Sequence, residues 1–209
     1  MAKRGPLELL LLLLFSCVLL FILPAPYSER EEIALNVDIL VDADDFYKSA
    51  SVNSIEKALE FSGRELLEKF NIGLVITEYR TWVFPKGAER LDADAAQKSI
   101  KRIFKNSNSD IVIAFTSNDI YQDNRAIGGN AYILGETALV KIDNNTSFAT
   151  LHEIYHLLGA KHFFGVGHSI MRGSPRISAI DKENYSAVEK GRRFLFWRKK
   201  FKKLKRLFN

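Results

Sequence analysis

The sequence predicts an α/β domain that follows an N-terminal transmembrane helix. Two observations support this prediction. Between residues 33 and 158, segments in which apolar residues recur at every second position, as in strands, alternate with segments in which they recur at helical spacing. Residues 1–26 contain a long apolar run. The 209 residues leave room for one domain of ordinary size. The only cysteine, Cys17, lies in the apolar run, so an intramolecular disulfide is not possible.

The N-terminal segment is expected to anchor the chain in a membrane. Its apolar run covers Leu9–Leu23, and a helix over Pro6–Leu23 would be about 27 Å long, close to the hydrocarbon thickness of a bilayer. A cleaved signal peptide is the alternative, but Pro26 directly after Ala25 argues against cleavage at this position. We therefore favour an uncleaved single-pass anchor in which residues 7–23 contact the lipid.

The charges on either side of the anchor predict its orientation. Lys3 and Arg4 precede the apolar run, whereas the linker that follows it, residues 27–32, is rich in glutamate. Because positively charged flanks tend to stay in the cytoplasm, the N-terminus is expected there. The domain is therefore expected outside the cytoplasm.

The first half of the domain shows a strand, a helix and a second strand. Ile33–Val41 alternates apolar and polar residues, as a strand with one buried face does. Ser54–Phe70 repeats apolar residues at helical spacing, and Gly63 is expected to interrupt or soften this helix. Leu74–Phe84 is rich in β-branched and aromatic residues and stops before Pro85, which predicts a strand.

A second helix and three further strands follow. Asp92–Phe104 is predicted to be a helix, with its first residue as the N-cap. The short apolar segment Asp110–Thr116 is typical of a strand that is buried on both faces. Ala131–Leu134 and Ala138–Ile142 are predicted strands on either side of Gly135. A sheet of about five strands is the expected result.

The helix that comes next contains the residues with the clearest chemical signal. The loop Asp143–Thr146 is expected to cap it, and four of its residues form an apolar stripe: Leu151, Ile154, Tyr155 and Leu158. His152 and His156 are four residues apart, so both point from one face of the helix. Two imidazoles on one face can share a metal ion, and Glu153 is placed to reach a water on that ion.

Gly159 and His162 extend this pattern. Glycine can adopt the left-handed conformation that ends a helix, so a sharp turn at Gly159 would bring His162 back as a third ligand. Three histidines and an open fourth position are typical of catalytic zinc. A bare H-E-x-x-H also occurs by chance, but the added glycine and histidine argue against chance. His168 is the alternative third ligand, although a loop histidine near a site is more often a surface residue.

The motif and the methionine after it resemble the signature of the metzincin zinc metallopeptidases, H-E-x-x-H-x-x-G-x-x-H followed by a methionine turn. The resemblance implies that His152, His156 and His162 bind Zn²⁺. It also implies that Glu153 is the general base and that Met171 lies beneath the metal. The expected fold is a metzincin-like catalytic domain with a twisted mixed sheet and an active-site helix, and the expected substrate is a protein or peptide.

The residues around the motif do not assign a metzincin subfamily. Archaemetzincins carry cysteines just after the third histidine, where this chain has Phe163 and His168. Astacins and serralysins place a tyrosine two residues after the methionine, where this chain has Gly173. The stretch Ile127–Tyr132 is similar to reprolysins or matrixins. The resemblance therefore extends to the metzincin clan and no further.

Two segments are expected to contact the substrate. Asn130–Leu134 is the candidate for an exposed sheet edge, where Asn130, Ala131 and Tyr132 would bind an extended peptide. Residues Arg172–Ile180, just after the methionine, would form the wall of the pocket for the side chain beyond the cleaved bond.

Two groups of aspartates could help to bind calcium, but neither has the spacing of a known calcium loop. They are Asp42, Asp44 and Asp45 in one group and Asp119 and Asp123 in the other. We expect solvated loop carboxylates at these positions.

The C-terminal segment, residues 191–209, differs from the rest of the chain in charge. Residues 192–209 contain nine Lys or Arg and no acidic residue, whereas the remainder contains 21 basic and 25 acidic residues. Aromatic and leucine residues recur at spacings of three and four: Phe194, Trp197, Phe201, Leu204 and Phe208. A basic amphipathic helix on the membrane surface is predicted. A solvated helix packed on the domain and a nucleic-acid patch are the alternatives, and the external location argues against nucleic acid.

Together these features predict a membrane-anchored zinc metalloendopeptidase whose catalytic domain spans residues 33–190. In the expected mechanism Glu153 takes a proton from the attacking water and delivers it to the leaving amine. The alternatives are a membrane-anchored binding or scaffold protein with a structural zinc, and a metal hydrolase of non-peptide amides. Glu153 argues against a structural site, because such a site needs no base and closes its fourth position with another ligand.

Overall fold

The computed structural model describes residues 31–83, 91–105, 107–164, 168–172 and 178–207, with side chains as far as Lys199. The predicted anchor, residues 1–26, lies outside the described residues. Within the described part of the chain, no helix is long and apolar enough to cross a bilayer. Residues Glu32–Asn209 form one compact unit, and both hydrophobic clusters of the described chain lie inside it.

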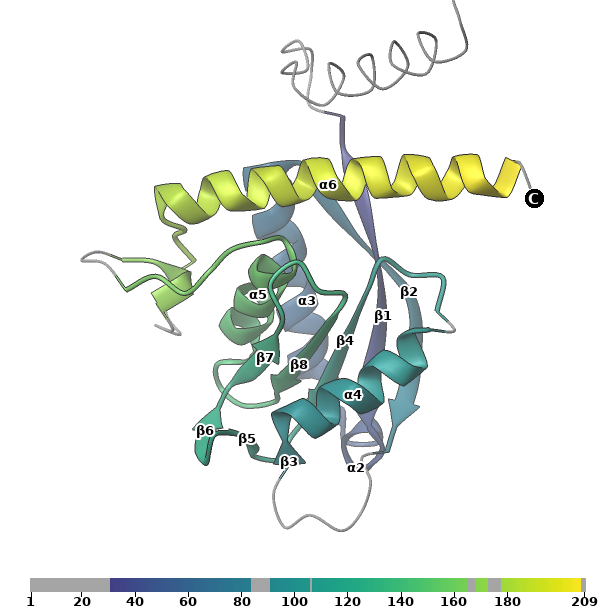
Figure 1. Ribbon diagram of the computed structural model, residues 1–209. Helices are drawn as coiled ribbons and strands as arrows, with labels where there is room; N and C mark the ends of the chain where they lie inside the picture. The colour runs from purple at the N-terminus through teal and green to yellow at the C-terminus, as the bar shows by residue number, and fades with distance from the viewer. Residues whose placement is uncertain (1–30, 84–90, 106, 165–167, 173–177, 208–209) are drawn as a thin grey trace, which may run out of the picture. The chain divides into compact units, whose positions relative to one another are not determined.

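The main sheet is mixed and five-stranded, as the sequence predicts (Figure 1). Its strands in spatial order are β2 (Ile72–Trp82), β1 (Ile33–Asp42), β4 (Ile111–Thr116), β8 (Thr137–Lys141) and β7 (Gly129–Ala131). The first four strands are parallel, whereas β7 pairs antiparallel to β8. The amino ends of the four parallel strands therefore meet at one edge of the sheet, and their carboxyl ends meet at the opposite edge.

A small three-stranded sheet, which the sequence did not predict, lies beside the main one. It consists of β3 (Leu91–Asp92), β5 (Ile120–Gln122) and β6 (Arg125–Ile127). The β5–β6 hairpin turns at Asp123 and Asn124, whose φ angles of 50° and 61° are both left-handed. Such two-residue turns favour Asp and Asn. Asp123 is therefore explained as a turn residue.

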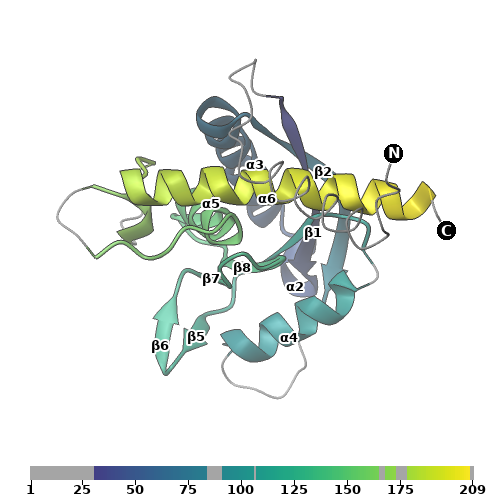
Figure 2. The ribbon, with the colours of Figure 1, turned by 45° about the horizontal axis from the view of Figure 1, so that its top comes forward.

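Helices cover both faces of the main sheet (Figures 1 and 2). On one face lie α3 (Ser49–Phe70) and α5 (Thr146–Leu157), and on the other lies α4 (Ala93–Phe104). The remaining helices are α2 (Ala43–Phe46), the single 3₁₀ turn η1 (Ile170–Arg172) and α6 (Lys182–Leu207). The layers are those of an α/β domain, as expected.

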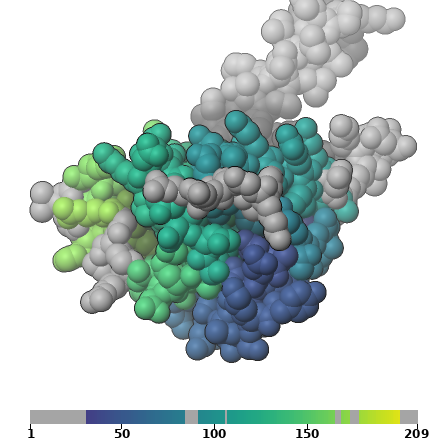
Figure 3. Space-filling model, turned by 90° about the horizontal axis from the view of Figure 1, so that it is seen from below, coloured from purple at the N-terminus to yellow at the C-terminus, as the bar shows by residue number. Residues whose placement is uncertain are grey.

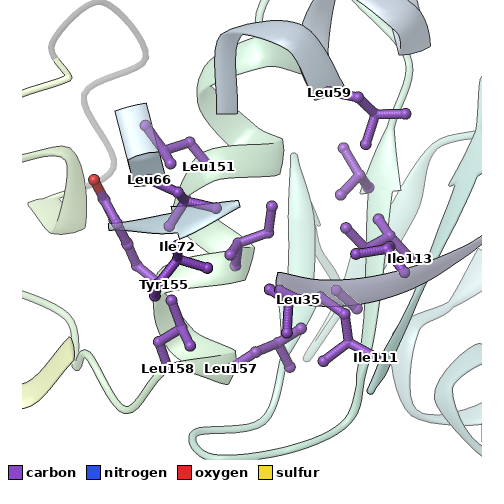
Figure 4. Close-up of a cluster of buried hydrophobic side chains, with 14 of the residues drawn as sticks. Leu35, Leu59, Leu66, Ile72, Ile111, Ile113, Leu151, Tyr155, Leu157 and Leu158 are labelled. Atoms are coloured by element: carbon purple, nitrogen blue, oxygen red, sulfur yellow. The ribbon is translucent and has the colours of Figure 1, made fainter. Parts of the chain in front are cut away.

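Each face of the sheet has its own hydrophobic cluster, because alternate strand residues point to opposite faces. Figure 4 shows part of the larger cluster, to which Leu35, Ile113 and Leu151 belong. On the other face, Val112 packs in a cluster with Ile100 of α4. All six residues of β4 are buried, which confirms the predicted burial on both faces. Each such aliphatic side chain stabilises the fold by about 1.5–3 kcal/mol.

Helix α3 is continuous through Gly63, contrary to the predicted interruption, and it begins at Ser49 rather than Ser54. A Cβ atom at Gly63 would lie 3.6 Å from Cβ of Leu74, which is an ordinary contact, so the glycine packs against β2. The neighbouring apolar residues Leu59 and Leu66 are buried in the core. Their burial outweighs the roughly 1 kcal/mol that glycine costs inside a helix.

The segment after β7 is a turn, whereas the sequence predicted a strand over Ala131–Leu134. The N–H of Gly135 donates to the carbonyl of Tyr132 at 2.8 Å, and Leu134 has a left-handed φ of 56°. The N–H of Leu134 donates to the carbonyl of His156 at 3.0 Å, at the end of α5. This tertiary contact overrides the strand propensity of the aromatic and β-branched residues in the segment.

Two aspartates at or just after the end of β1, Asp42 and Asp45, are buried and structural, which corrects the expectation of solvated carboxylates for them, whereas Asp44 is exposed as expected. Asp42 is buried and accepts hydrogen bonds from the N–H of Asp44 and the hydroxyl of Thr116. Asp45 is fully buried and pairs with Lys48 at 2.9 Å. Burial alone would raise the pKa of Asp45, but hydrogen bonds from Lys48 and the Ser117 N–H outweigh it and hold that pKa below its usual value. These oxygens are engaged by the protein itself.

Helix α6 crosses the end of the sheet and packs on the end of α5 (Figures 1 and 2). Val188 and Leu195 are buried on its inner side. Between them, a Cβ atom at Gly191 would lie 1.9 Å from the carbonyl oxygen of Leu158, so only glycine permits this approach. The predicted boundary between domain and tail at residue 190 falls inside this helix.

Gly191→Ala is expected to destabilise the protein, because the clash is with backbone and α6 must move away from α5. The expected loss in the free energy of unfolding is about 1–3 kcal/mol, as in other overpacked sites. Urea denaturation of the variant and the wild type measures it. Gly63→Ala is the matched control, since the added methyl group makes an ordinary contact there and improves helix propensity. A Gly191→Ala variant as stable as the wild type would contradict the close helix contact.

Candidate metal centre

Three histidines from α5 and the turn after it meet at one point. The Nε2 atom of His156 lies 3.0 Å from Nε2 of His152 and 3.2 Å from Nε2 of His162. Tetrahedral zinc with Zn–N bonds of 2.0–2.1 Å separates its nitrogen ligands by roughly 3.3 Å. Among the described residues, these three form the cluster suited to hold a metal ion, and exposed His168 is not part of it.

Backbone carbonyls fix the orientation of two of the rings. Nδ1 of His152 lies 2.9 Å from the carbonyl oxygen of Ile170, and Nδ1 of His156 lies 2.8 Å from that of Ala160. A carbonyl only accepts, so each Nδ1–H donates and each Nε2 presents its lone pair to the common point. Burial, together with the neighbouring His156, lowers the pKa of His152 to about 4, and burial also lowers the pKa of His156. Both rings are therefore neutral near pH 7, as metal binding requires.

The chain reverses at Gly159, as predicted, and this reversal brings His162 to the cluster. Gly159 has a left-handed φ of 100°, and the N–H of Ala160 donates to the carbonyl of Tyr155 at 2.9 Å. The N–H of Lys161 donates to Oδ1 of Asn184 at 2.7 Å, which ties the turn to α6. Asn184 is a supporting residue that sequence reasoning missed, because its partner is 23 residues away.

Glu153 lies beside the histidines and is buried, with 5% of its surface exposed. Its Oε2 atom has no hydrogen-bond partner in the described protein. Burial raises the pKa of this carboxyl well above its usual value. Such an uncompensated buried carboxyl is costly in a purely structural role, and it is typical of a functional group.

Gly129 on β7 provides the space that the Glu153 side chain occupies. A Cβ atom at Gly129 would lie 2.7 Å from Oε1 and 2.8 Å from Cγ of Glu153. Gly129 is the second residue of the Gly128–Gly129 pair, and its role was not predicted from the sequence. The edge strand and the candidate base therefore depend on each other for their positions.

Met171 lies in η1 and is completely buried. Its carbonyl accepts from the N–H of Phe163 at 3.0 Å, directly after His162 in sequence. Its N–H donates to the hydroxyl of Ser169 at 3.2 Å, and Ser169 in turn donates to Asp181 at 2.7 Å. The methionine turn is thus joined to the segment that contains His162. The carbonyl of Ile170 in the same turn contacts the ring of His152.

The metal cluster opens into a cavity of about 790 Å³. His152, Glu153 and His162 line it, and Gly128 and Gly129 border it from the sheet. Its apolar lining consists of Ala126, Ile127, Phe148, Ala149, Phe163, Phe164, Ile170 and Met171. Figure 3 shows this end of the molecule, where green residues of the β5–α5 region adjoin yellow-green residues of the later chain.

The candidate substrate residues Asn130, Ala131 and Tyr132 do not line this cavity. The carbonyl of Asn130 accepts from Gln97 at 2.6 Å, and the hydroxyl of Tyr132 donates to Asp94 of α4 at 2.8 Å. Of the expected wall Arg172–Ile180, Arg172 lines the cavity, and residues 173–177 lie outside the described part.

Tyr185 of α6 packs its ring 4.7 Å from that of Phe70 and donates its hydroxyl to the carbonyl of Lys69 at 3.0 Å. It therefore supports the core rather than the metal cluster.

Gly129→Ala is expected to displace Glu153 while leaving the histidines in place. Peptide hydrolysis should fall by at least about tenfold, because a misplaced base loses much of its effect, and zinc content should stay at the wild-type value. Steady-state kinetics and metal analysis measure the two quantities. Gly128→Ala is the matched control, since a Cβ atom there meets its nearest neighbour only at 4.0 Å. Equal loss in both variants would show that Gly129 has no special part in placing Glu153.

No protein-family model matches the sequence, and no curated protein is significantly similar to it. Solved structures nevertheless share its fold. Archaemetzincin from Methanopyrus kandleri superimposes with a TM-score of 0.58 at 14% identity, over 80% of this chain and 99% of that one. Metalloproteinase-II from Bacteroides fragilis has a TM-score of 0.56 at 17% identity, over 79% of this chain and 55% of that one.

A third similar structure is described as a chaperone–substrate complex, with a TM-score of 0.59 at 15% identity. The match covers 78% of this chain and 34% of that one, so this chain spans about a third of the length of that structure. At these identities the likeness concerns the fold alone. The five-stranded mixed sheet and its helices match the fold of archaemetzincin.

Proposed function

We propose that the protein is a zinc-dependent metalloendopeptidase in which His152, His156 and His162 hold the metal and Glu153 is the general base. One observation carries the proposal: three imidazole nitrogens converge at the wall of a cavity, beside a buried carboxylate oxygen without a protein partner. The shared fold of archaemetzincin and metalloproteinase-II supports it.

The residues present fit a catalytic zinc ion. The nitrogen separations of 3.0 and 3.2 Å are close to the roughly 3.3 Å of a tetrahedral site. The described cluster contains three ligands, which leaves a fourth position for water or substrate. This arrangement argues against the scaffold alternative, because structural zinc sites are closed by four protein ligands.

When bound, zinc would polarise the substrate carbonyl and lower the pKa of a water molecule. The chain's own residues then handle the protons. The free oxygen of Glu153 accepts a proton from the attacking water, and the same carboxyl delivers it to the amine that leaves. The backbone carbonyls of Ile170 and Ala160 keep the His152 and His156 rings in one tautomer throughout.

The cavity and the sheet edge favour a peptide over another amide substrate. β7 is an edge strand of the main sheet, so an extended chain can add to it by backbone hydrogen bonds. The aromatic and aliphatic lining of the cavity, which includes Phe148 and Phe163, suits a large apolar side chain. Hydrolysis of a small non-peptide amide would require neither feature.

Incubation of the purified full chain with an unfolded protein tests the proposal. We expect cleavage that a chelator abolishes and added zinc restores, because the histidines supply the metal's protein ligands. Sequencing of the product ends would show large apolar residues on the side of the cut that occupies the cavity. Absence of cleavage in the zinc-loaded protein, together with hydrolysis of a small amide, would favour the alternative hydrolase.

Membrane anchoring through residues 7–23, with the domain outside the cytoplasm, is part of the same proposal. It is supported by the apolar run and by the charges that flank it. Carbonate extraction of membranes and protease digestion of intact cells test the two parts separately. Release of the chain by carbonate would contradict the anchor, and full protection from external protease would contradict the orientation.

A further inference from the structure

Helix α6 has two sides with different surroundings. Its inner side is defined by four buried residues at helical spacing: Asn184, Val188, Gly191 and Leu195. The apolar row predicted from the sequence begins at Phe194 and Trp197 and continues at helical spacing through positions 201 and 204. At 3.6 residues per turn, this row is displaced by about 130° around the axis from the inner side. Phe194, the first residue of the row, therefore lies away from the inner side.

The exposed apolar surface extends from α6 onto the turn after β7. Phe194 is 56% exposed, and Ile133 and Leu134 are 46% and 54% exposed. This turn lies near α6, because Glu136, directly after the turn, pairs with Arg198 at 2.8 Å. Arg198 is one helical turn beyond Phe194 on α6. Two separate segments thus contribute exposed apolar side chains next to a helix that is rich in lysine and arginine.

The same helix lies where the chain enters the domain. Lys199 donates to the carbonyl of Ala34, near the start of β1, and pairs with Asp110 at 2.6 Å, just before β4. Arg198 also donates to the carbonyl of Asp110 at 2.8 Å. Helix α6 therefore crosses the amino ends of the parallel strands, and the apolar run Leu9–Leu23 ends ten residues upstream of Ile33, the first residue of β1.

The metal cavity lies at the other end of the strands. Lys141, the last residue of β8, and Asp143 line the cavity, whereas Glu136, just before β8, pairs with α6. The five residues of β8 span roughly 17 Å. A surface that contacts α6 would therefore leave the cavity open to solvent on the opposite side.

We infer that the outer side of α6, together with Ile133 and Leu134, docks onto an anionic lipid surface. Lysine and arginine pair with acidic head groups, and aromatic and leucine side chains enter the interface between head groups and acyl chains. Nucleic acid would use the same positive charge, but it gives no reason for a continuous apolar row between the charges. The helix holds the domain with its cavity directed away from the bilayer.

Vesicle binding by residues 32–209 tests the inference, since this compact unit contains both hydrophobic clusters and lacks the apolar run. We expect it to sediment with vesicles of phosphatidylglycerol and phosphatidylcholine and to stay in solution with phosphatidylcholine alone. Removal of four α6 charges should weaken binding by roughly 600-fold, at about fivefold per charge. The substitutions are Lys190→Gln, Arg193→Gln, Lys200→Gln and Lys205→Gln.

The matched control removes four exposed charges elsewhere and should change binding little. It consists of Lys57→Gln, Lys98→Gln, Arg102→Gln and Lys105→Gln on α3 and at α4. For the apolar row, Phe194→Ser should weaken binding by about tenfold. Its control is Tyr47→Ser, because Tyr47 is 84% exposed at the carboxyl end of the sheet. Circular dichroism confirms that each variant is folded.

Three results would overturn the inference. The first is no sedimentation of the wild-type unit with anionic vesicles. The second is equal binding by the α6 charge variant and its control. The third is tight binding to duplex DNA, measured by fluorescence anisotropy at the same salt concentration, without vesicle binding. Because none of these measurements depends on peptide hydrolysis, failure here leaves the proposed enzyme activity standing.

Discussion

Glu153→Ala is expected to lose peptide hydrolysis by about a hundredfold or more while keeping its zinc. The carboxylate is buried beside the metal cluster but is not part of it, and one of its oxygens has no protein partner. Its removal therefore deletes the base without deleting a ligand. Steady-state kinetics on a peptide and metal analysis of the same preparation measure the two effects.

Two further variants make this result specific. Glu153→Gln keeps the shape of the side chain but cannot accept the proton, so it should lose as much activity as the alanine variant. Glu60→Ala removes an exposed glutamate from α3 and should keep wild-type activity. Near wild-type hydrolysis by Glu153→Gln, or loss of zinc from it, would require another residue as the base.

His156→Ala is expected to weaken zinc binding by more than about a hundredfold and to abolish hydrolysis. His156 is the central ligand, since its Nε2 lies within 3.2 Å of both other histidine nitrogens. It is also the buried member of the cluster, so no solvent-exposed group can easily replace it. Competition with a chromophoric chelator gives the zinc affinity of the variant and of the wild type.

His162→Ala and His168→Ala separate the two candidates for the third ligand. His162 belongs to the cluster and its replacement should weaken zinc binding clearly, whereas replacement of exposed His168 should leave the affinity unchanged. The opposite order of effects would place the third ligand at His168. Equal wild-type affinity in both would mean that zinc binds elsewhere.

The metal cluster was predictable because its geometry is mostly local. Two histidines four apart on a helix share a face in any protein, and Gly159 predicts the reversal that brings His162 back. The supporting contacts were not predictable, because they join distant parts of the chain. Asn184 acts from α6, and Gly129 makes room for Glu153 from β7. The Gly128–Gly129 pair is the sequence signal that could have indicated the close approach of β7 to Glu153.

The fold shows the same division between local and tertiary information. β1 and β4 follow from their apolar patterns, because a two-residue repeat and a short apolar run reflect burial directly. The turn at Leu134 could not be predicted, since a hydrogen bond to His156 decides its conformation. Continuity of α3 through Gly63 likewise depends on packing against β2, which sequence periodicity does not report.

The uninterrupted course of α6 has a mechanical consequence. One rod of 26 residues contacts the end of the metal helix through Gly191, ties the third-ligand turn through Asn184, and reaches the entry of β1 through Lys199. A shift of its far half would therefore also change the contacts that Gly191 and Asn184 make next to the metal cluster. By thermodynamic linkage, if metal binding strengthens the binding of a ligand to the far half of α6, that ligand must strengthen metal binding by the same free energy.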